Sequence, residues 1–104
     1  MIEKVYKFYT GDEKMIEKVI MDENVHLMHM VLPKGDALPE HFTNANVYMI
    51  VAKGLLSISL DDEPKAEYTA GHVLNIPEHT KMNVKNFYDE TLELFVVKAP
   101  ASKL

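Results

Sequence analysis

Turn-forming residues interrupt this chain so often that most segments between them are too short for an ordinary helix. Those segments are rich in β-branched and aromatic residues, which favour strands. Many short strands separated by regularly spaced turns are typical of an antiparallel sandwich or barrel. Strands are predicted at residues 5–9, 15–20, 25–32, 47–52, 55–60, 73–76 and 92–97.

Three of these segments need separate interpretation. In residues 55–60, Leu or Ile occupies every second position from Leu56, which is the alternation of a strand with one buried face. Residues 47–52 are apolar throughout, so either both faces are covered or one face meets another subunit. A helix over residues 12–21 competes with the strand at 15–20, but the segment is short and leads directly into the next apolar run. We therefore favour a strand there.

The length and composition indicate one domain in the cytoplasm. The 104 residues, of which 47% are hydrophobic, suffice for a single core. No stretch approaches the roughly 18 consecutive apolar residues that span a bilayer, and the first residues lack a secretory pattern. The final Ser102-Lys103-Leu104 matches a peroxisomal address, but a lysine-rich chain without arginine favours a prokaryotic source, where that match is a coincidence.

Two residue types are missing, and each absence limits the chemistry. Without cysteine the chain has no disulfides, thiolate nucleophiles or Cys-based metal sites, so any metal would need histidine, carboxylate or water. All eleven basic residues are lysine, so no guanidinium can hold an anion through two parallel hydrogen bonds. The formal net charge of -5 disfavours nucleic acid and anionic membranes as partners.

Two groups of residues have the spacing of a pair of linked motifs. The first group is Gly35, His41, Thr43, Val47 and Gly54, and the second is Gly71, Pro77, His79, Met82 and Asn86. Glycine reaches positive φ where strands turn, and proline fixes φ at a strand entry. In order and spacing these groups resemble the two motifs of the cupin superfamily, over about residues 25–98.

The resemblance implies an all-β fold, the jelly-roll barrel also called a double-stranded β-helix. Its members are commonly paired into homodimers, so we expect a homodimer. A single domain would then occupy residues 1–104, with N-terminal strands in 1–24, the barrel at about 25–98 and a short tail at 99–104.

The resemblance also implies a metal site that this sequence has largely lost. In cupins two histidines and a glutamate of the first motif, with a histidine of the second, hold a divalent metal such as iron, manganese, nickel or zinc. Only His41 keeps its ligand type here, while Thr43, Val47 and Met82 stand at the other positions. Threonine is a weak ligand, valine has no donor atom and a thioether is soft, so a hard divalent ion finds few donors. We therefore predict no metal cofactor.

The predicted function is the binding of a small molecule inside the barrel. Methionine side chains adapt to irregular apolar shapes, which suits a pocket for a flexible hydrophobic molecule. The residues predicted to line this pocket are His41, Thr43, Val47, Tyr48, Met49 and Met82.

Three alternatives stay open. His41 and His79 could hold zinc, nickel, iron or manganese in a rebuilt site of a dioxygenase-like or isomerase-like enzyme. His41 could instead act with Tyr48 or Glu93 as the acid–base pair of a metal-free isomerase or epimerase, as in some cupins that act on sugars. Strand parity leaves open whether Tyr48 and Glu93 face inward. The third alternative is a dimer with a structural or regulatory role.

Two further histidines share the predicted strand at 25–32. His26 and His29 are an odd number of positions apart, so their side chains face opposite sides of that strand. One of them is expected to enter the barrel, and the other to lie at the surface or at an interface.

Overall fold

The computed structural model describes residues 1–101, and these form nine strands and no helix. The strands are β1 (Met15–Met21), β2 (His26–Leu32), β3 (His41–Phe42), β4 (Val47–Lys53), β5 (Leu55–Leu60), β6 (Ala66–Thr69), β7 (Val73–Ile76), β8 (Lys81–Lys85) and β9 (Leu92–Lys98). Within this part of the chain, no helix has the length and apolarity to cross a membrane.

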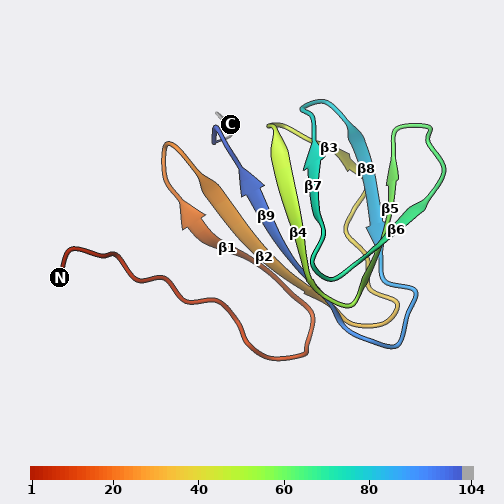
Figure 1. Cartoon of the computed structure of the whole chain (residues 1–104), viewed down its shortest axis with the longest axis horizontal. Helices are drawn as coiled ribbons and strands as arrows, with labels where there is room; N and C mark the ends of the chain where they lie inside the picture. Colours follow the sequence, from red (N-terminus) through yellow and green to blue (C-terminus); the bar gives the residue numbers. More distant parts are fainter. Residues whose placement is uncertain (102–104) are drawn as a thin grey trace.

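The strands form two sheets that pack against each other (Figure 1). The five-stranded sheet has the order β1-β2-β9-β4-β7, and the four-stranded sheet has the order β3-β8-β5-β6. All neighbouring strands pair antiparallel. The last strand, β9, lies between β2 and β4, so residues far apart in the sequence share one sheet. The predicted all-β architecture of two antiparallel sheets is confirmed.

Most predicted strands are confirmed, including residues 15–20, where the strand and not the helix forms. The strand predicted at residues 5–9 is wrong. These residues belong to an extended arm over residues 1–14, whose first residues run away from the sheets (Figure 1). The Phe8 ring packs on His29 and Phe95, so the arm contacts the sheet through side chains and not through a backbone ladder. The short strands β3, β6 and β8 were not predicted, because each has only two to five residues and they hold several charged or polar side chains.

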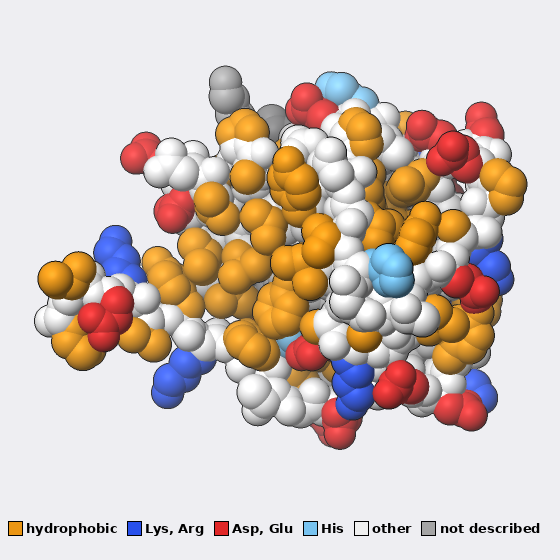
Figure 2. Space-filling model, in the orientation of Figure 1, with side chains coloured by type: hydrophobic (Ala, Val, Ile, Leu, Met, Phe, Trp, Pro, Cys, Tyr) orange, Lys and Arg blue, Asp and Glu red, His pale blue; other side chains and the backbone are white. Residues whose placement is uncertain are grey.

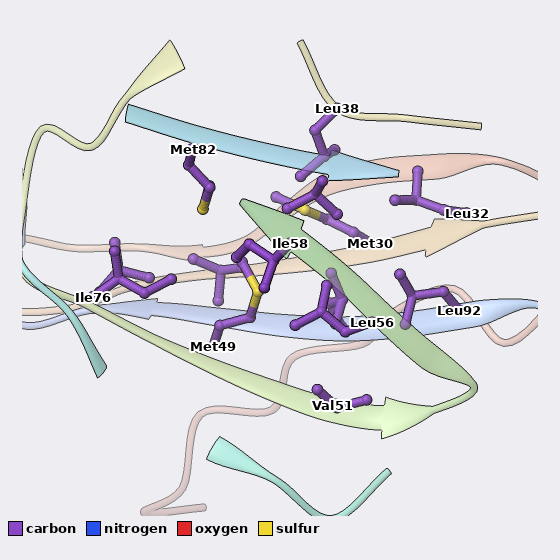
Figure 3. Packing of buried hydrophobic residues seen from close by; sticks show 14 residues of the cluster. Met30, Leu32, Leu38, Met49, Val51, Leu56, Ile58, Ile76, Met82 and Leu92 are labelled. Carbon is purple, nitrogen blue, oxygen red and sulfur yellow. The ribbon is translucent and has the colours of Figure 1, made fainter. Parts of the chain in front are cut away.

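The core lies between the sheets and follows strand alternation. Met49 and Val51 of β4 belong to the same buried cluster as Leu56 and Ile58 of β5 (Figure 3). Each such side chain contributes about 1.5–3 kcal/mol when it leaves water. The alternation predicted for residues 55–60 is therefore confirmed at Leu56 and Ile58, both of which are buried.

On the outer face of the five-stranded sheet, β4 and β9 present apolar side chains. Tyr48 and Ile50 alternate with the buried residues of β4, and their register partners on β9 are Val97 and Phe95. Tyr48 is exposed. Figure 2 shows hydrophobic side chains gathered on this side of the molecule. The homodimer expected from the family resemblance stays a prediction.

Asn86 holds the end of β2 to the loop before β9. Its side chain is fully buried, and Nδ2 donates to the carbonyls of Leu32 at 2.8 Å and Glu90 at 2.9 Å. Its Oδ1 accepts from the Tyr88 amide at 2.9 Å. The Gly35 amide donates to the Asn86 carbonyl at 2.8 Å, so one residue of each motif meets here.

The predicted tail is only partly described. The Ala101 amide donates to the Asn24 carbonyl at 2.9 Å, which places Ala101 beside the turn between β1 and β2. Residues 102–104, including the C-terminal Ser-Lys-Leu, lie outside the described residues.

Gly54 offers a test of the β4–β5 turn. Its φ is +85°, and an added Cβ would lie 2.6 Å from the Thr91 carbonyl oxygen, which is backbone and cannot rotate away. We expect G54A to lose about 1–3 kcal/mol through backbone strain and a similar amount through the forced shift, measured by urea unfolding. G71A is the control, since φ is +95° there but nothing lies within 4 Å. Equal losses in the two variants would contradict the close approach.

Candidate functional site

A cavity of about 230 Å³ opens between the two sheets. Its wall is mostly apolar, with three methionines, and its polar side chains are few. The lining residues are Ile16, Met28, Met30, Leu38, Pro39, His41, Phe42, Thr43, Asn44, Val47, Met82, Val96 and Lys98.

Strand register explains how distant residues meet in this wall. Met28 pairs with Val96 across β2 and β9, so these two side chains share the inner face of the sheet. His41 pairs with Met82 across β3 and β8 in the opposite sheet. The inner faces of both sheets therefore contribute to one cavity.

The six residues predicted to line the pocket fall into three places. His41, Thr43, Val47 and Met82 line the cavity. Met49 is fully buried in the core, outside the cavity lining. Tyr48 alternates with Val47 and Met49 and lies on the outer face of the sheet, 40% exposed.

The His41 ring has a defined hydrogen-bond direction. Its Nδ1 lies 2.8 Å from the Pro39 carbonyl oxygen. A carbonyl only accepts, so Nδ1 carries a proton, and in the neutral ring Nε2 is left as an acceptor. The exposed His41 side chain can therefore accept a hydrogen bond from a molecule in the cavity.

Thr43 is engaged in local structure. Its Oγ1 donates to the Pro77 carbonyl at 2.7 Å and accepts from the Thr80 amide at 2.9 Å. The Thr43 amide donates to the Thr80 carbonyl, and its carbonyl accepts from the His79 amide, both at 2.9 Å. Thr43 thus joins the end of β3 to the turn before β8.

Comparison with known proteins gives one strong relative. The uncharacterised protein MJ0764 of Methanocaldococcus jannaschii is 39% identical over 104 residues, which cover 99% of this chain and 90% of the relative. Its crystal structure, described as an RmlC-like cupin family protein with a double-stranded β-helix fold, matches with a TM-score of 0.92 and 40% identity. That match covers 96% of this chain and 93% of the other.

The chain belongs to the cupin superfamily. This confirms the resemblance and the jelly-roll fold that the two motifs predicted. No family model matches the sequence.

More distant cupins share the fold alone. A Cupin 2 conserved barrel domain protein from Salinispora arenicola has a TM-score of 0.74 at 17% identity, covering 91% of this chain and 82% of the other. A cupin domain from Bordetella pertussis has a TM-score of 0.73 at 18% identity, covering 90% of this chain and 100% of the other.

The donor set of this cupin does not fit the metal of its family. Within residues 1–101, no group of three His, Asp or Glu side chains is placed to hold a metal ion. His79 is not part of the cavity lining, and its side chain is 82% exposed with Nε2 3.7 Å from Glu78. His41 is thus the one imidazole of the described chain that lines the cavity.

Lys98 places a cation beside the cavity. Its Nζ donates to Asn44 Oδ1 at 2.9 Å. Burial lowers the pKa of Lys98, and the positive charge of Lys18 lowers it further. Both effects disfavour the charged ammonium, so an anionic or hydrogen-bonding group nearby would stabilise it.

His29 lies on the outer face of the five-stranded sheet. The sequence predicted only that His26 and His29 face opposite sides of their strand, not which side each takes. It is fully buried, with Nδ1 2.8 Å from Glu17 Oε2 and Nε2 2.7 Å from Glu93 Oε2. Its ring lies 4.8 Å from the rings of both Phe8 and Phe95. Glu93 is therefore occupied by His29, and the structure does not bring Glu93 and His41 together as an acid–base pair.

Glu17 also holds the N-terminal arm. Its Oε2 accepts from the Tyr9 amide at 2.7 Å. This bond has the largest effect in lowering the pKa of Glu17, and the bond to His29 lowers it further. Sequence reasoning missed the Glu17–His29–Glu93 cluster, because Glu93 lies 64 positions from His29.

The bonds of Thr43 can be tested with a variant of the same shape. T43V leaves the buried Thr80 amide without its partner, so we expect a loss of about 1–3 kcal/mol in the free energy of unfolding, measured by urea denaturation. T43S keeps the hydroxyl and should recover most of that loss. If T43S loses as much unfolding free energy as T43V, loss of the hydroxyl does not explain the destabilisation.

The carboxylate of Glu17 predicts an acid-dependent stability. A carboxyl whose pKa is lowered on folding stabilises the fold above its ordinary pKa of 4.5, and this stabilisation is lost as the pH falls from there through the lowered value. Between about pH 6 and about pH 3, E17Q should therefore lose less unfolding free energy than the parent chain. Urea denaturation followed by circular dichroism measures this. E23Q, in an exposed turn, should keep the parental pH dependence, and a parental dependence in E17Q would contradict the assignment.

Proposed function

We propose that this cupin binds a small, mostly apolar molecule in the cavity between its sheets, without the metal of its family. The observation that carries the proposal is the wall itself. Met28, Met30 and Met82 line the cavity, and His41 also lines it with Nδ1 already bonded to the Pro39 carbonyl, which leaves Nε2 as an acceptor.

The methionines give the wall its adaptability. An unbranched thioether changes shape at low cost and contacts varied apolar surfaces. Ligand cavities are mostly apolar, with a few polar groups that orient the ligand. Met30 and Met82 belong to the core as well as to the wall, so a bound molecule would extend the apolar packing already present.

The polar side chains indicate one polar group on the ligand. His41 offers an acceptor, while Asn44 and Lys98 form a hydrogen-bonded pair in the same wall. A hydroxyl would donate to His41, and a carboxylate would offset the unfavourable surroundings of the Lys98 charge. We infer a ligand with an apolar body and a single hydroxyl or carboxylate.

Binding can be followed at the methionine methyl groups. The probes are hexan-1-ol and hexanoate, added to the full chain labelled with ¹³C at the methionine methyls. We expect saturable shifts at Met28, Met30 and Met82, with Met1 and Met21 unchanged because both are exposed and outside the cavity lining. Shifts confined to Met1 and Met21, or no saturable shift at all, would overturn the proposal.

His41 provides the matched variant. H41A should change the unfolding free energy by no more than about 0.5 kcal/mol, because the side chain is exposed. The same variant should weaken hexan-1-ol binding by about tenfold, through loss of one hydrogen bond. H79A removes an exposed histidine outside the cavity and should bind as the parent does. Joint zinc-induced shifts of both histidine rings, at low micromolar zinc, would favour the rebuilt metal site instead.

A further inference from the structure

A second cavity, of about 270 Å³, lies on the four-stranded sheet. Ser57 pairs with Lys85 and Ser59 pairs with Asn83 across β5 and β8. These four residues alternate with the core residues of their strands, so their side chains share the outer face of the sheet. All four line the second cavity, and none of them lines the cavity between the sheets; Leu38 is the one residue that lines both.

Two lysines converge on this cavity without a negative partner. The Nζ atoms of Lys65 and Lys85 lie 4.5 Å and 5.2 Å from the centroid of one ring, that of Phe87. Glu67 on β6 is the register partner of Ser57, yet neither ammonium comes within ion-pair distance of any carboxylate among residues 1–101. In a chain with a net charge of -5, two adjacent unpaired ammonium groups leave a local site for a negative charge.

A buried hydroxyl in the same wall lacks a partner. Ser57 is 2% exposed, and its Oγ makes no hydrogen bond within the described chain. Leaving such a group unsatisfied costs about 1–3 kcal/mol. An oxygen-bearing ligand in the cavity would supply the missing bond.

We propose that this outer cavity binds a small organic anion, a carboxylate or phosphate ester with a compact apolar body. The two ammonium groups attract the anionic group as point charges, and the serine hydroxyls and the Asn83 amide donate to its oxygens. Leu38 and the Phe87 ring supply the apolar part of the wall. The proposal does not depend on the cavity between the sheets.

The test uses amide NMR of the full chain, titrated separately with phenyl phosphate, benzoate, benzyl alcohol and inorganic phosphate. We expect saturable shifts at Ser57, Ser59, Asn83 and Lys85 with phenyl phosphate or benzoate, and the tighter of these two identifies the preferred anionic group. Benzyl alcohol should not bind, because it lacks the charge. Binding of benzyl alcohol, or equally tight binding of inorganic phosphate, would overturn the proposal of an organic anion.

Variants separate this site from general charge effects. Replacing both lysines, K65Q with K85Q, should weaken binding by about tenfold per lysine removed. The control pair K7Q with K14Q changes the net charge equally but lies on the N-terminal arm. S57A should weaken binding without lowering stability, since it removes an unsatisfied hydroxyl.

Two results would count against the assignment. One is equal weakening in both lysine pairs, which would indicate a long-range charge effect. The other is movement of the Met30 and Met82 methyls by phenyl phosphate, with the outer amides unchanged, which would place the ligand between the sheets. Failure of the cavity between the sheets to bind hexan-1-ol leaves this outer site unaffected.

Discussion

Each sheet of this cupin turns an apolar face toward the other sheet, and the packing of those two inner faces is the constraint on which the rest of the structure depends. Because side chains alternate along a strand, the burial of Met49 on β4 sends Tyr48 to the opposite face. A slip of one residue would exchange them and expose the core face of β4. Leu56 on β5 and Leu94 on β9 belong to different sheets and are also fully buried. They fix in the same way which face of each of these strands points inward. Once these positions are set, one-residue slips of the neighbouring strands are disfavoured as well.

Packing between the sheets is incomplete beside β3, and the cavity lies there. The positions that the family resemblance assigns to metal ligands, namely His41, Thr43, Val47 and Met82, contribute to this wall. Thr43 uses its hydroxyl for two hydrogen bonds within the chain. Val47 and Met82 belong to the buried cluster. Of these four residues, His41 alone keeps a ring nitrogen that can accept a hydrogen bond from a ligand. This nitrogen is Nε2, since Nδ1 is bonded to the Pro39 carbonyl. The wall therefore favours apolar contact with one oriented hydrogen bond.

The outer faces of the two sheets differ in whether their ionisable side chains have partners of opposite charge within residues 1–101. On the five-stranded sheet, His29 is surrounded by Glu17 and Glu93, and Phe8 covers its ring, so this cluster is satisfied within the chain. On the four-stranded sheet, Lys65 and Lys85 meet at Phe87 without a carboxylate partner among residues 1–101. A satisfied cluster stabilises the arm and the sheet. An unsatisfied pair of like charges instead attracts a ligand of opposite charge.

The amino-acid sequence by itself determined the strand-rich architecture, the two cupin motifs and the loss of most metal donors, because alternation, turn residues and ligand types are local properties. The same local pattern wrongly predicted a strand at residues 5–9, since a strand also needs a backbone partner. Only the tertiary structure decided which side of its strand His29 occupies, and that Glu93 reaches it from 64 positions away. It also brought Lys65 and Lys85 to one ring. Such meetings depend on which strands become neighbours, and no local periodicity encodes that.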